Sequence, residues 1–358
     1  MIWRGGLLIL IVALAYLLLW PVPIDPAHWQ PPPPPAGETR FAPNSRLAKV
    51  ERIAGGVGLG PEAVNIDAQG RLVTGFVDGR VMRFTADGSQ GELLADTGGR
   101  PLGLDFAANG DVIVADAVRG LLRIDAGGQV RVLASEAAGV PLGFTDDVVV
   151  SDNDIAYYSD ASVKFGVHEV MLDALEHRPN GRLVATDLKT GTTRVLLTGL
   201  YFANGVALGP DAAYLLITET TRYRVQRYWL KGDKAGTAEV LIDNLPGFPD
   251  NITFNGKDRF WLALYAPRTA SLDSLLPYPF LRKVVARLPA AVQPAPVMHG
   301  FVLGLNPAGE VEVNLQDSNP GAYAPITSVR EGQDYLYFGS LSAPSLARLP
   351  LSALPRGM

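Results

Sequence analysis

From about residue 41 the chain alternates short apolar runs with turns rich in glycine, aspartate and asparagine. Short runs bounded by such turns are typical of the strands of β-hairpins. The first group of runs covers 64–67, 72–76, 81–84 and 92–94, and the second covers 102–106, 112–115, 121–124 and 130–133. Four short strands that recur at a period of about 40 to 50 residues are typical of one blade of a β-propeller.

The same pattern continues to the end of the chain. Further units begin near residues 146, 204 and 250, and the last one spans 326–349. This last unit lacks a fourth strand, whereas 47–53 is an unassigned strand near the start. Pairing the two would close the ring and remove two exposed sheet edges. The pattern therefore predicts an all-β, six-bladed β-propeller.

An apolar N-terminal segment precedes the repeats. Residues 7–20 are unbroken apolar sequence, and the uncharged span from 5 to 24 is long enough to cross a hydrocarbon core of about 30 Å. Arg4 before the span and Asp25 after it favour an N-inside orientation. We therefore predict an N-terminal transmembrane helix, a single-pass signal-anchor that places the propeller on the extracytoplasmic side. The alternative is a cleaved signal peptide, although no small-x-small cleavage site follows the apolar run.

Two regions depart from the blade pattern. We divide the chain into an anchor at 1–24, a proline-rich linker at 25–40 and the propeller at 41–358, and we expect residues 31–35 of the linker to form a stiff polyproline spacer that holds the propeller off the membrane. Residues 168–177 have helical spacing. Residues 267–299 are too long for a blade loop, which indicates a lid, a binding loop or a segment that dips into lipid; the alternative is a surface flap with no chemical role.

Composition excludes several functions. The net charge is −5 and no basic run is longer than a pair, so a nucleic-acid partner is not expected. The chain has no cysteine, which excludes disulfides, thiol catalysis and thiolate metal sites. It also has no Gly-x-Ser-x-Gly elbow, so a serine hydrolase triad is unsupported.

Four segments share one arrangement, in which an oxygen-bearing side chain stands two residues before a β-branched residue at the start of a blade. Such residues meet in space if their strands converge on the propeller axis, and gathered oxygens suit a hard cation such as Ca²⁺. The alternative is that these residues only cap turns. The predicted metal ligands are Glu62, Asp146, Asn204, Asp250 and Asn251.

Several motifs, at 99–104, 173–183, 202–207, 227–230 and 245–252, resemble the strictosidine synthase-like family and, within it, a membrane-anchored branch. The resemblance implies a six-bladed propeller distantly similar to the paraoxonases and the regucalcin/gluconolactonase group, which are Ca²⁺-dependent lactonases and esterases. It places the paraoxonase-like metal positions on the same five residues, with Asp146 in place of the usual Asn. An acid of a second calcium site falls on Ala63, although Asp147 remains.

The resemblance also indicates what the chain lacks. The catalytic His of the paraoxonases falls near Leu102, and the Glu of true strictosidine synthases falls on Thr327. A threonine cannot transfer a proton near neutral pH, which argues against alkaloid synthesis.

Two functions remain open. The first is a Ca²⁺-dependent hydrolase (an arylesterase or lactonase) of small-molecule ester or lactone substrates, with Asp250 as the general base towards water. The second is a non-catalytic, membrane-tethered binding or scaffold propeller in which a structural calcium ion joins the blades.

Overall fold

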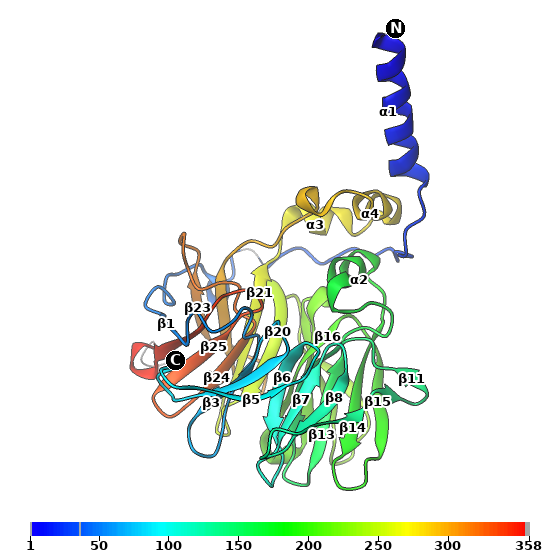
Figure 1. The fold of residues 1–358 in the computed structure, drawn as a ribbon. Coiled ribbons are helices and arrows are strands. Elements are labelled where there is room, and N and C mark those ends of the chain that lie inside the picture. Colours follow the sequence, from blue (N-terminus) through cyan, green and yellow to red (C-terminus); the bar gives the residue numbers. More distant parts are fainter. Residues whose placement is uncertain (1, 36, 355–358) are drawn as a thin grey trace.

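The computed structural model describes residues 2–35 and 37–354, so residues 1, 36 and 355–358 of the predicted anchor, linker and propeller lie outside the described residues. Six four-stranded antiparallel sheets surround a common axis, which confirms the predicted six-bladed propeller (Figure 1). A small hairpin, β10 (Glu136–Ala137) with β11 (Val140–Pro141), projects between the second and third blades.

Each blade runs from an inner to an outer strand in chain order. Blade one is β2 (Val64–Ile66), β3 (Leu72–Gly75), β4 (Arg80–Phe84) and β5 (Gly91–Asp96), and blade two is β6 (Pro101–Phe106), β7 (Val112–Asp116), β8 (Gly120–Ile124) and β9 (Val130–Ala134). Blade three is β12 (Thr145–Val150), β13 (Ile155–Asp160), β14 (Gly181–Asp187) and β15 (Thr193–Leu200). Blade four is β16 (Ala203–Leu208), β17 (Tyr214–Glu219), β18 (Arg224–Trp229) and β19 (Ala238–Ile242). Blade five is β20 (Gly247–Phe254), β21 (Phe260–Pro267), β22 (Gly300–Leu305) and β23 (Val311–Asp317).

The sixth blade closes the ring as predicted. It comprises β24 (Ser328–Glu331), β25 (Tyr335–Gly339) and β26 (Leu346–Pro350), and its outer strand is β1 (Glu51–Ile53) from the start of the chain. β1 pairs with β26 through Glu51 opposite Arg348, and the Arg348 Nε donates to Glu51 Oε2 at 2.8 Å. The closing strand gives the sixth blade four paired strands, as in the other five.

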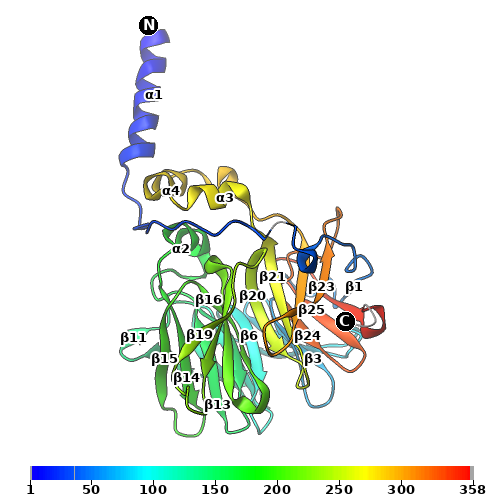
Figure 2. The same cartoon turned by 180° about the vertical axis from the view of Figure 1, so that it is seen from behind.

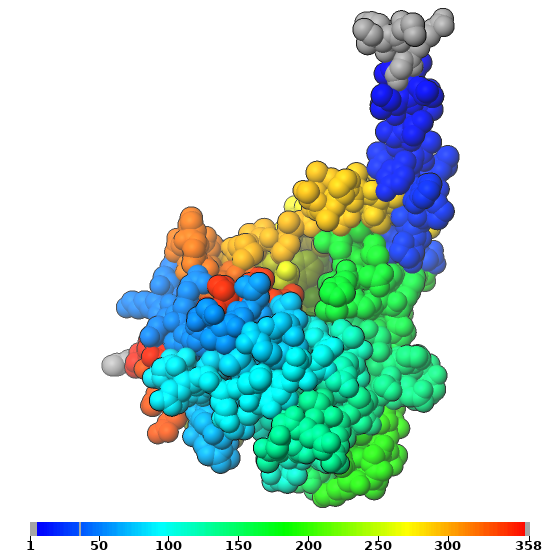
Figure 3. All heavy atoms as spheres, viewed as in Figure 1, coloured from blue at the N-terminus to red at the C-terminus, as the bar shows by residue number. Residues whose placement is uncertain are grey.

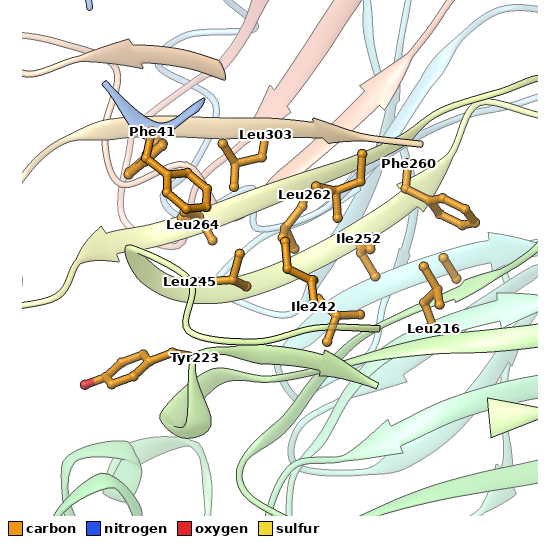
Figure 4. Packing of buried hydrophobic residues seen from close by; sticks show 14 of the residues in the cluster. Phe41, Leu216, Tyr223, Ile242, Leu245, Ile252, Phe260, Leu262, Leu264 and Leu303 are labelled. Carbon is orange, nitrogen blue, oxygen red and sulfur yellow. The ribbon is translucent and has the colours of Figure 1, made fainter. Parts of the chain in front are cut away.

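The core lies between neighbouring blades, where alternate side chains of facing sheets interdigitate. Between blades four and five, Leu216, Ile252 and Leu262 are fully buried, and Phe41 of the short helix η1 (Thr39–Phe41) covers one end (Figure 4). Successive side chains of a strand point to opposite faces of its sheet, so each blade presents apolar side chains to both neighbouring blades. This period of two is the pattern from which the sequence predicted strands.

Most helices lie at one end of the propeller. α2 (Val170–Glu176) follows β13, as the helical spacing of 168–177 predicted, and α3 (Ala270–Leu275) and α4 (Pro279–Ala286) form the insertion after β21. α1 (Ile2–Leu19) projects away from this end, and α3 and α4 lie at its base (Figures 1 and 2). Single-turn 3₁₀ helices are η2 (Val167–Glu169), η3 (Pro210–Ala212), η4 (Thr220–Arg222), η5 (Ala290–Val292) and η6 (Leu351–Ala353).

The N-terminal helix does not support the predicted transmembrane span. Over the residues that the structure describes, no helix combines the length and the apolar character needed to cross a membrane. The apolar side chains of α1 from Leu7 onward are nevertheless largely exposed.

The predicted spacer at 31–35 does not stand free of the propeller, since Pro32 and Pro33 accept hydrogen bonds from it. Residues 22–33 instead run along the end of the propeller that carries the helices. Ile24 is buried against Phe165 and Leu175. Ala27 N donates to the Glu176 carbonyl at 3.1 Å, and Arg268 Nη2 donates to the Pro32 carbonyl at 2.7 Å. We call residues 22–33 the strap. Its buried apolar side chains and backbone hydrogen bonds hold it against the propeller, and they outweigh the preference of a free proline-rich chain for an extended conformation that projects into solvent.

Candidate functional site

A β-bulge recurs at the same place in the inner strands of blades two to five. In β12 the pairing passes from Thr145–Asp160 to Val148–Tyr158, so Asp146 and Asp147 together face one residue of the next strand. The same register shift occurs in the other three inner strands, between Pro101 and Leu104, between Ala203 and Val206, and between Pro249 and Ile252. A bulge re-aims a side chain and is common beside functional sites. In three of the four segments, at Asp146, Asn204 and Asp250, the arrangement seen in the sequence is therefore a bulge, whereas Glu62 precedes β2, whose pairing shows no register shift.

Glycine at the second bulge position lets neighbouring blades approach closely. A Cβ on Gly205 would lie 2.5 Å from Ile252 N and 2.6 Å from Asn251 Cα. A Cβ on Gly103 would lie 2.3 Å from Asp147 Oδ1. Only glycine fits at these two contacts, so the bulges of adjacent blades pack directly against one another around the axis.

The predicted ligand residues lie at this end of the axis and are at most 6% exposed. Asn251 Nδ2 donates to Glu62 Oε1 at 2.6 Å. Three further oxygens of the set are buried without a hydrogen-bond partner, namely Glu62 Oε2, Asn204 Oδ1 and Asn251 Oδ1. An unpaired buried acceptor costs roughly 1 to 3 kcal/mol, so a cation or a hydrogen-bond donor placed at these three oxygens would stabilise the cluster.

The carboxylates of the cluster are poorly solvated. Burial raises the pKa of Glu62 to about 7, although the Arg100 charge and the hydrogen bond from Asn251 act in the opposite direction. Burial, followed by the charge of Glu62, raises the pKa values of Asp146 and Asp250 well above their usual range. Perturbed carboxyl groups in a cleft are a physical criterion for a functional site.

Two further charged residues lie beside the cluster: Asp147, noted from the sequence only in relation to a second calcium site, and Arg100, which the sequence analysis missed. Burial raises the pKa of Asp147 to about 8, and its two oxygens accept from Val148 N and Val206 N, each at 2.8 Å. Arg100 is buried, donates from Nη1 to the Gly60 carbonyl at 2.9 Å, and has no partner for Nη2. It gives the cluster a resident positive charge. Its place in the blade repeat could have identified Arg100 from the sequence, since it stands two residues before the first bulge residue of blade two.

A cavity of about 340 Å³ opens above the cluster. Its polar end is formed by Glu62, Asp146, Asn204 and Asp250, whereas the walls are mostly apolar. The covering residues come from α2, from α3 and from the segment 294–296, so both insertions contribute to the roof. The space-filling view shows the gold insertion overhanging this end of the molecule (Figure 3).

Three phenylalanines form a collar above the axial oxygens. Phe144, Phe202 and Phe248 each stand two residues before the bulge residue of their blade, and all three line the cavity. The rings of Phe144 and Phe202 meet edge to face, with centroids 5.5 Å apart. Phe202 adopts a left-handed backbone with φ of 53°, a strained conformation that is most often retained at functional sites. The repeated Phe-x-Asp/Asn spacing in the sequence is the signal that could have predicted these three residues as part of the site.

The structure places the remaining predicted positions as follows. Leu102 occupies the first bulge position of blade two and lines the cavity. Thr327 donates from Oγ1 to the Glu62 carbonyl at 2.7 Å. In the described part of the chain, no group of three or more His, Cys, Asp or Glu side chains is arranged to hold a metal ion. A metal at the axis would therefore need the amide oxygens of Asn204 and Asn251 as well as carboxylates.

The fold and site together define a six-bladed propeller with a buried carboxylate–amide cluster at the floor of an apolar pocket. A strictosidine synthase family model matches residues 146–233, and a model of the strictosidine synthase-like N-terminal region matches residues 39–84. Protein STRICTOSIDINE SYNTHASE-LIKE 6 of Arabidopsis thaliana is 38% identical over 335 residues, which cover 90% of this chain and 86% of the relative. The adipocyte plasma membrane-associated protein of Bos taurus is 32% identical over 363 residues, which cover 94% and 87%. The chain belongs to the strictosidine synthase-like family.

Solved structures with the same fold are more distant in sequence. A gluconolactonase from Xanthomonas campestris superposes with a TM-score of 0.61 at 17% identity, over 93% of this chain and 99% of that chain. The calcium-binding protein regucalcin from Agrobacterium tumefaciens superposes with a TM-score of 0.59 at 13% identity, over 83% and 92%. These similarities agree with the propeller fold that the resemblance implied.

Proposed function

We propose that this protein is a calcium-dependent hydrolase of apolar lactones or aryl esters. The observation that carries the proposal is the apolar cavity of about 340 Å³ whose floor consists of buried carboxylate and amide oxygens. A pocket of this kind, with a few convergent polar groups at one end, is the usual form of a small-molecule site. Two proteins of the same fold, one described as a gluconolactonase and the other as a calcium-binding protein, support the same proposal.

The donor set fits a calcium ion. Calcium takes six to eight oxygen ligands from carboxylates, amides and carbonyls in a flexible shell. Glu62, Asp146, Asn204, Asp250 and Asn251 would hold the ion, and the three unpartnered oxygens among them are acceptors that it would satisfy. When bound, the ion would supply positive charge that balances the carboxylates and stabilises negative charge developing on a carbonyl oxygen.

Asp250 is the proposed general base. Its carboxylate lines the cavity. Burial and neighbouring negative charge raise its pKa well above the usual range in the metal-free protein, and a bound calcium ion would lower that pKa again. Asp250 would accept a proton from a water molecule whose oxygen attacks the ester carbonyl carbon. The proton then passes to the leaving alkoxide or phenoxide oxygen as the ester C–O bond breaks, which yields a carboxylic acid and an alcohol or phenol.

The walls favour a neutral, apolar substrate. Phe144, Phe202, Phe248 and Met171 line the cavity, and the described charged residues that line it are the acids of its floor. An anionic substrate would meet these acids without a cationic wall residue to pair with. A flat ring could instead pack against the aromatic collar.

The decisive experiment is a panel of lactones and phenyl acetate assayed with the full chain, with calcium and after chelation. Asp250→Asn should reduce kcat by at least about 100-fold, within the contribution usual for general-base catalysis. Asp243→Asn, on an exposed loop, is the matched control and should have normal activity. Turnover that survives both chelation and Asp250→Asn would contradict the mechanism.

One observation favours a non-catalytic binding or scaffold propeller instead. Leu102 and Thr327 occupy the axial positions at which the resemblance places the catalytic residues of paraoxonases and strictosidine synthases. In this alternative a calcium ion would only join the blades. Chelation would then lower the melting temperature, and no member of the substrate panel would be turned over.

We further propose that the N-terminal segment attaches the propeller to a membrane, with the propeller on the extracytoplasmic side. The exposed apolar side chains of α1 from Leu7 onward support attachment, and Arg4 before the apolar run supports the orientation. Protease protection of the full chain in sealed vesicles would test both parts of this proposal.

A further inference from the structure

An exposed apolar face lies beside the base of α1. Tyr278, Phe280 and Met298 are 57%, 56% and 55% exposed, and beyond α1 and the adjoining Trp20 they are the only strongly exposed aromatic or methionine side chains in the described residues. Strongly exposed aliphatic side chains adjoin them. We call this set the roof face; it consists of Tyr278, Phe280, Leu281, Val292, Val297 and Met298. Scattered exposed valines need no explanation, but a concentration of large apolar groups on one segment does.

We propose that α1 and the roof face form one lipid-contacting surface that holds the roof of the pocket against a bilayer. This inference rests on the membrane attachment proposed above and specifies how the propeller is oriented on the membrane. It replaces the picture in which a proline-rich spacer keeps the propeller away from the lipid.

The position of α1 relative to α4 is held by specific contacts. Arg287, just after α4, donates from Nε to the Trp20 carbonyl at 2.6 Å and from Nη1 to the Leu17 carbonyl at 3.0 Å. The hydroxyl of Tyr16 donates to the Arg287 carbonyl at 3.2 Å. In both views α1 rises from the level at which α3 and α4 lie (Figures 1 and 2). A bilayer that receives α1 therefore meets the roof face at the base of that helix.

The strap holds the same elements together from below. The fully buried Arg282 of α4 donates to the Leu175 carbonyl at 2.9 Å and also to the Ala27 carbonyl of the strap. His28 Nδ1 lies 2.7 Å from the Pro277 carbonyl. These bonds tie the insertion, α2 and the strap into one unit, so α1 cannot move far from the roof without breaking them.

The insertion carries no negative charge that would oppose a lipid surface. Residues 278–298 contain no acidic residue; of their basic residues, Arg282 and Arg287 are buried on backbone carbonyls, whereas Lys283 is partly exposed. A partly exposed basic side chain near an apolar helix face favours the phosphate-rich interface of a bilayer. Asp273, the acid nearest before this stretch, is already paired with Arg268 at 2.8 Å.

The roof face also contains an open apolar groove of about 450 Å³, lined by residues that include Leu281, Val285 and Val292. Pro294 lines both this groove and the central cavity. The lipid-contacting surface therefore lies next to the pocket, in a position from which a neutral substrate dissolved in the bilayer could reach it.

The absence of cysteine makes a direct test possible, since each single-cysteine variant of the full chain carries one thiol. Phe280→Cys and Met298→Cys probe the roof face, and Leu10→Cys probes α1. Val240→Cys and Leu93→Cys are exposed controls on the outer strands of blades four and one. Each variant is labelled with an environment-sensitive fluorophore and reconstituted into phosphatidylcholine vesicles that contain spin-labelled lipid.

We expect lipid quenching of the label at positions 280, 298 and 10, and none at positions 240 and 93. Quenching at position 10 alone would overturn the proposal, because the roof would then lie away from the lipid. A second result would also overturn it: labels at 280 and 298 that are shielded from water only at a high ratio of protein to lipid and are not quenched by spin-labelled lipid. That result would indicate that the roof face contacts another copy of the protein. Melting temperatures of the variants check folding. Phenyl acetate turnover is measured separately, so failure of the hydrolase proposal is distinguishable from failure of this one.

Discussion

Asn251 Nδ2 donates to Glu62 Oε1 at 2.6 Å, which joins the inner end of blade five to that of blade one across the propeller axis. The bond uses the amide nitrogen of Asn251 and one oxygen of Glu62, and it leaves Glu62 Oε2 and Asn251 Oδ1 buried without partners. The cluster is thus assembled from distant segments but incompletely satisfied by the protein. The first three predictions concern the consequences of that imbalance.

Calcium should stabilise the fold, and its removal should lower the melting temperature. Binding to the native state alone contributes RT ln(1 + [L]/Kd), about 2.7 kcal/mol at a hundredfold excess over Kd. Asp146→Asn removes one buried carboxylate, so it should weaken calcium binding and destabilise the metal-free protein less than it does the calcium-loaded protein. Differential scanning fluorimetry with calcium and with EDTA measures both effects. Equal melting temperatures in the two conditions would show that the axial metal site is wrong.

The metal-free protein should become less stable as pH rises from about 5 to about 8. Burial raises the pKa of Glu62 to about 7 and that of Asp147 to about 8, so the folded state keeps protons that the unfolded chain has already lost. The free energy of unfolding then falls with pH, by at most about 1.4 kcal/mol per pH unit for each group, and levels off above the folded pKa values.

Urea denaturation in EDTA at a series of pH values measures this dependence. Glu62→Gln cannot ionise and should flatten part of the slope. A metal-free protein whose stability increases over this pH range would contradict the assigned burial of the two carboxyl groups.

Arg100→Met should tighten calcium binding about tenfold while lowering the stability of the metal-free protein. The side chain places a positive charge near Glu62 and Asp146, where it repels a second cation and stabilises the carboxylates in the absence of one. Arg100→Lys retains the charge and is the matched control. Isothermal titration calorimetry gives the calcium Kd of each variant. An unchanged calcium affinity in Arg100→Met would show that the Arg100 charge does not act on the calcium site.

Phe248→Ala should raise KM for phenyl acetate by about tenfold, in the range expected when a pocket loses apolar contacts with its substrate. Phe248 is only half-buried and lines the cavity, so the loss of stability should be small. Phe254→Ala is the control, because Phe254 lies at the opposite end of the same strand, β20, and packs on Phe260 instead. Steady-state kinetics should show a KM effect in the first variant alone.

Gly205→Ala should destabilise the protein by about 1 to 3 kcal/mol, the usual range for overpacking. The added Cβ would collide with the backbone of Asn251 and Ile252 and push blades four and five apart. At Gly55 the nearest heavy atom to an added Cβ is 3.9 Å away, so Gly55→Ala is a suitable control. Chemical denaturation compares the two, and a neutral Gly205→Ala would contradict the close packing of the bulges.

Much of the fold could be predicted because strand alternation and turn chemistry are local properties. The Asx-Gly turns and period-2 runs indicated the blades, and the unpaired strand at 47–53 indicated ring closure, which the structure confirms with β1 beside β26. The candidate axial residues were also visible in the sequence, since each repeats at one place in a blade. Their roles as ligands remain predictions.

Contacts between distant segments decided the rest. The spacer prediction failed because residues 31–35 were interpreted as an isolated polyproline chain, whereas Arg268 and Asn244 bind the carbonyls of Pro32 and Pro33. The pocket roof likewise depends on Arg282, whose partners at Ala27 and Leu175 lie more than a hundred residues away. The sequence by itself determined the blades and the order of the axial side chains, because hydrogen-bonded strands and turns follow from neighbouring residues. Only the tertiary structure decided the bulge packing, the apolar pocket and the course of the strap, because each depends on which buried polar and apolar groups meet after the ring has closed.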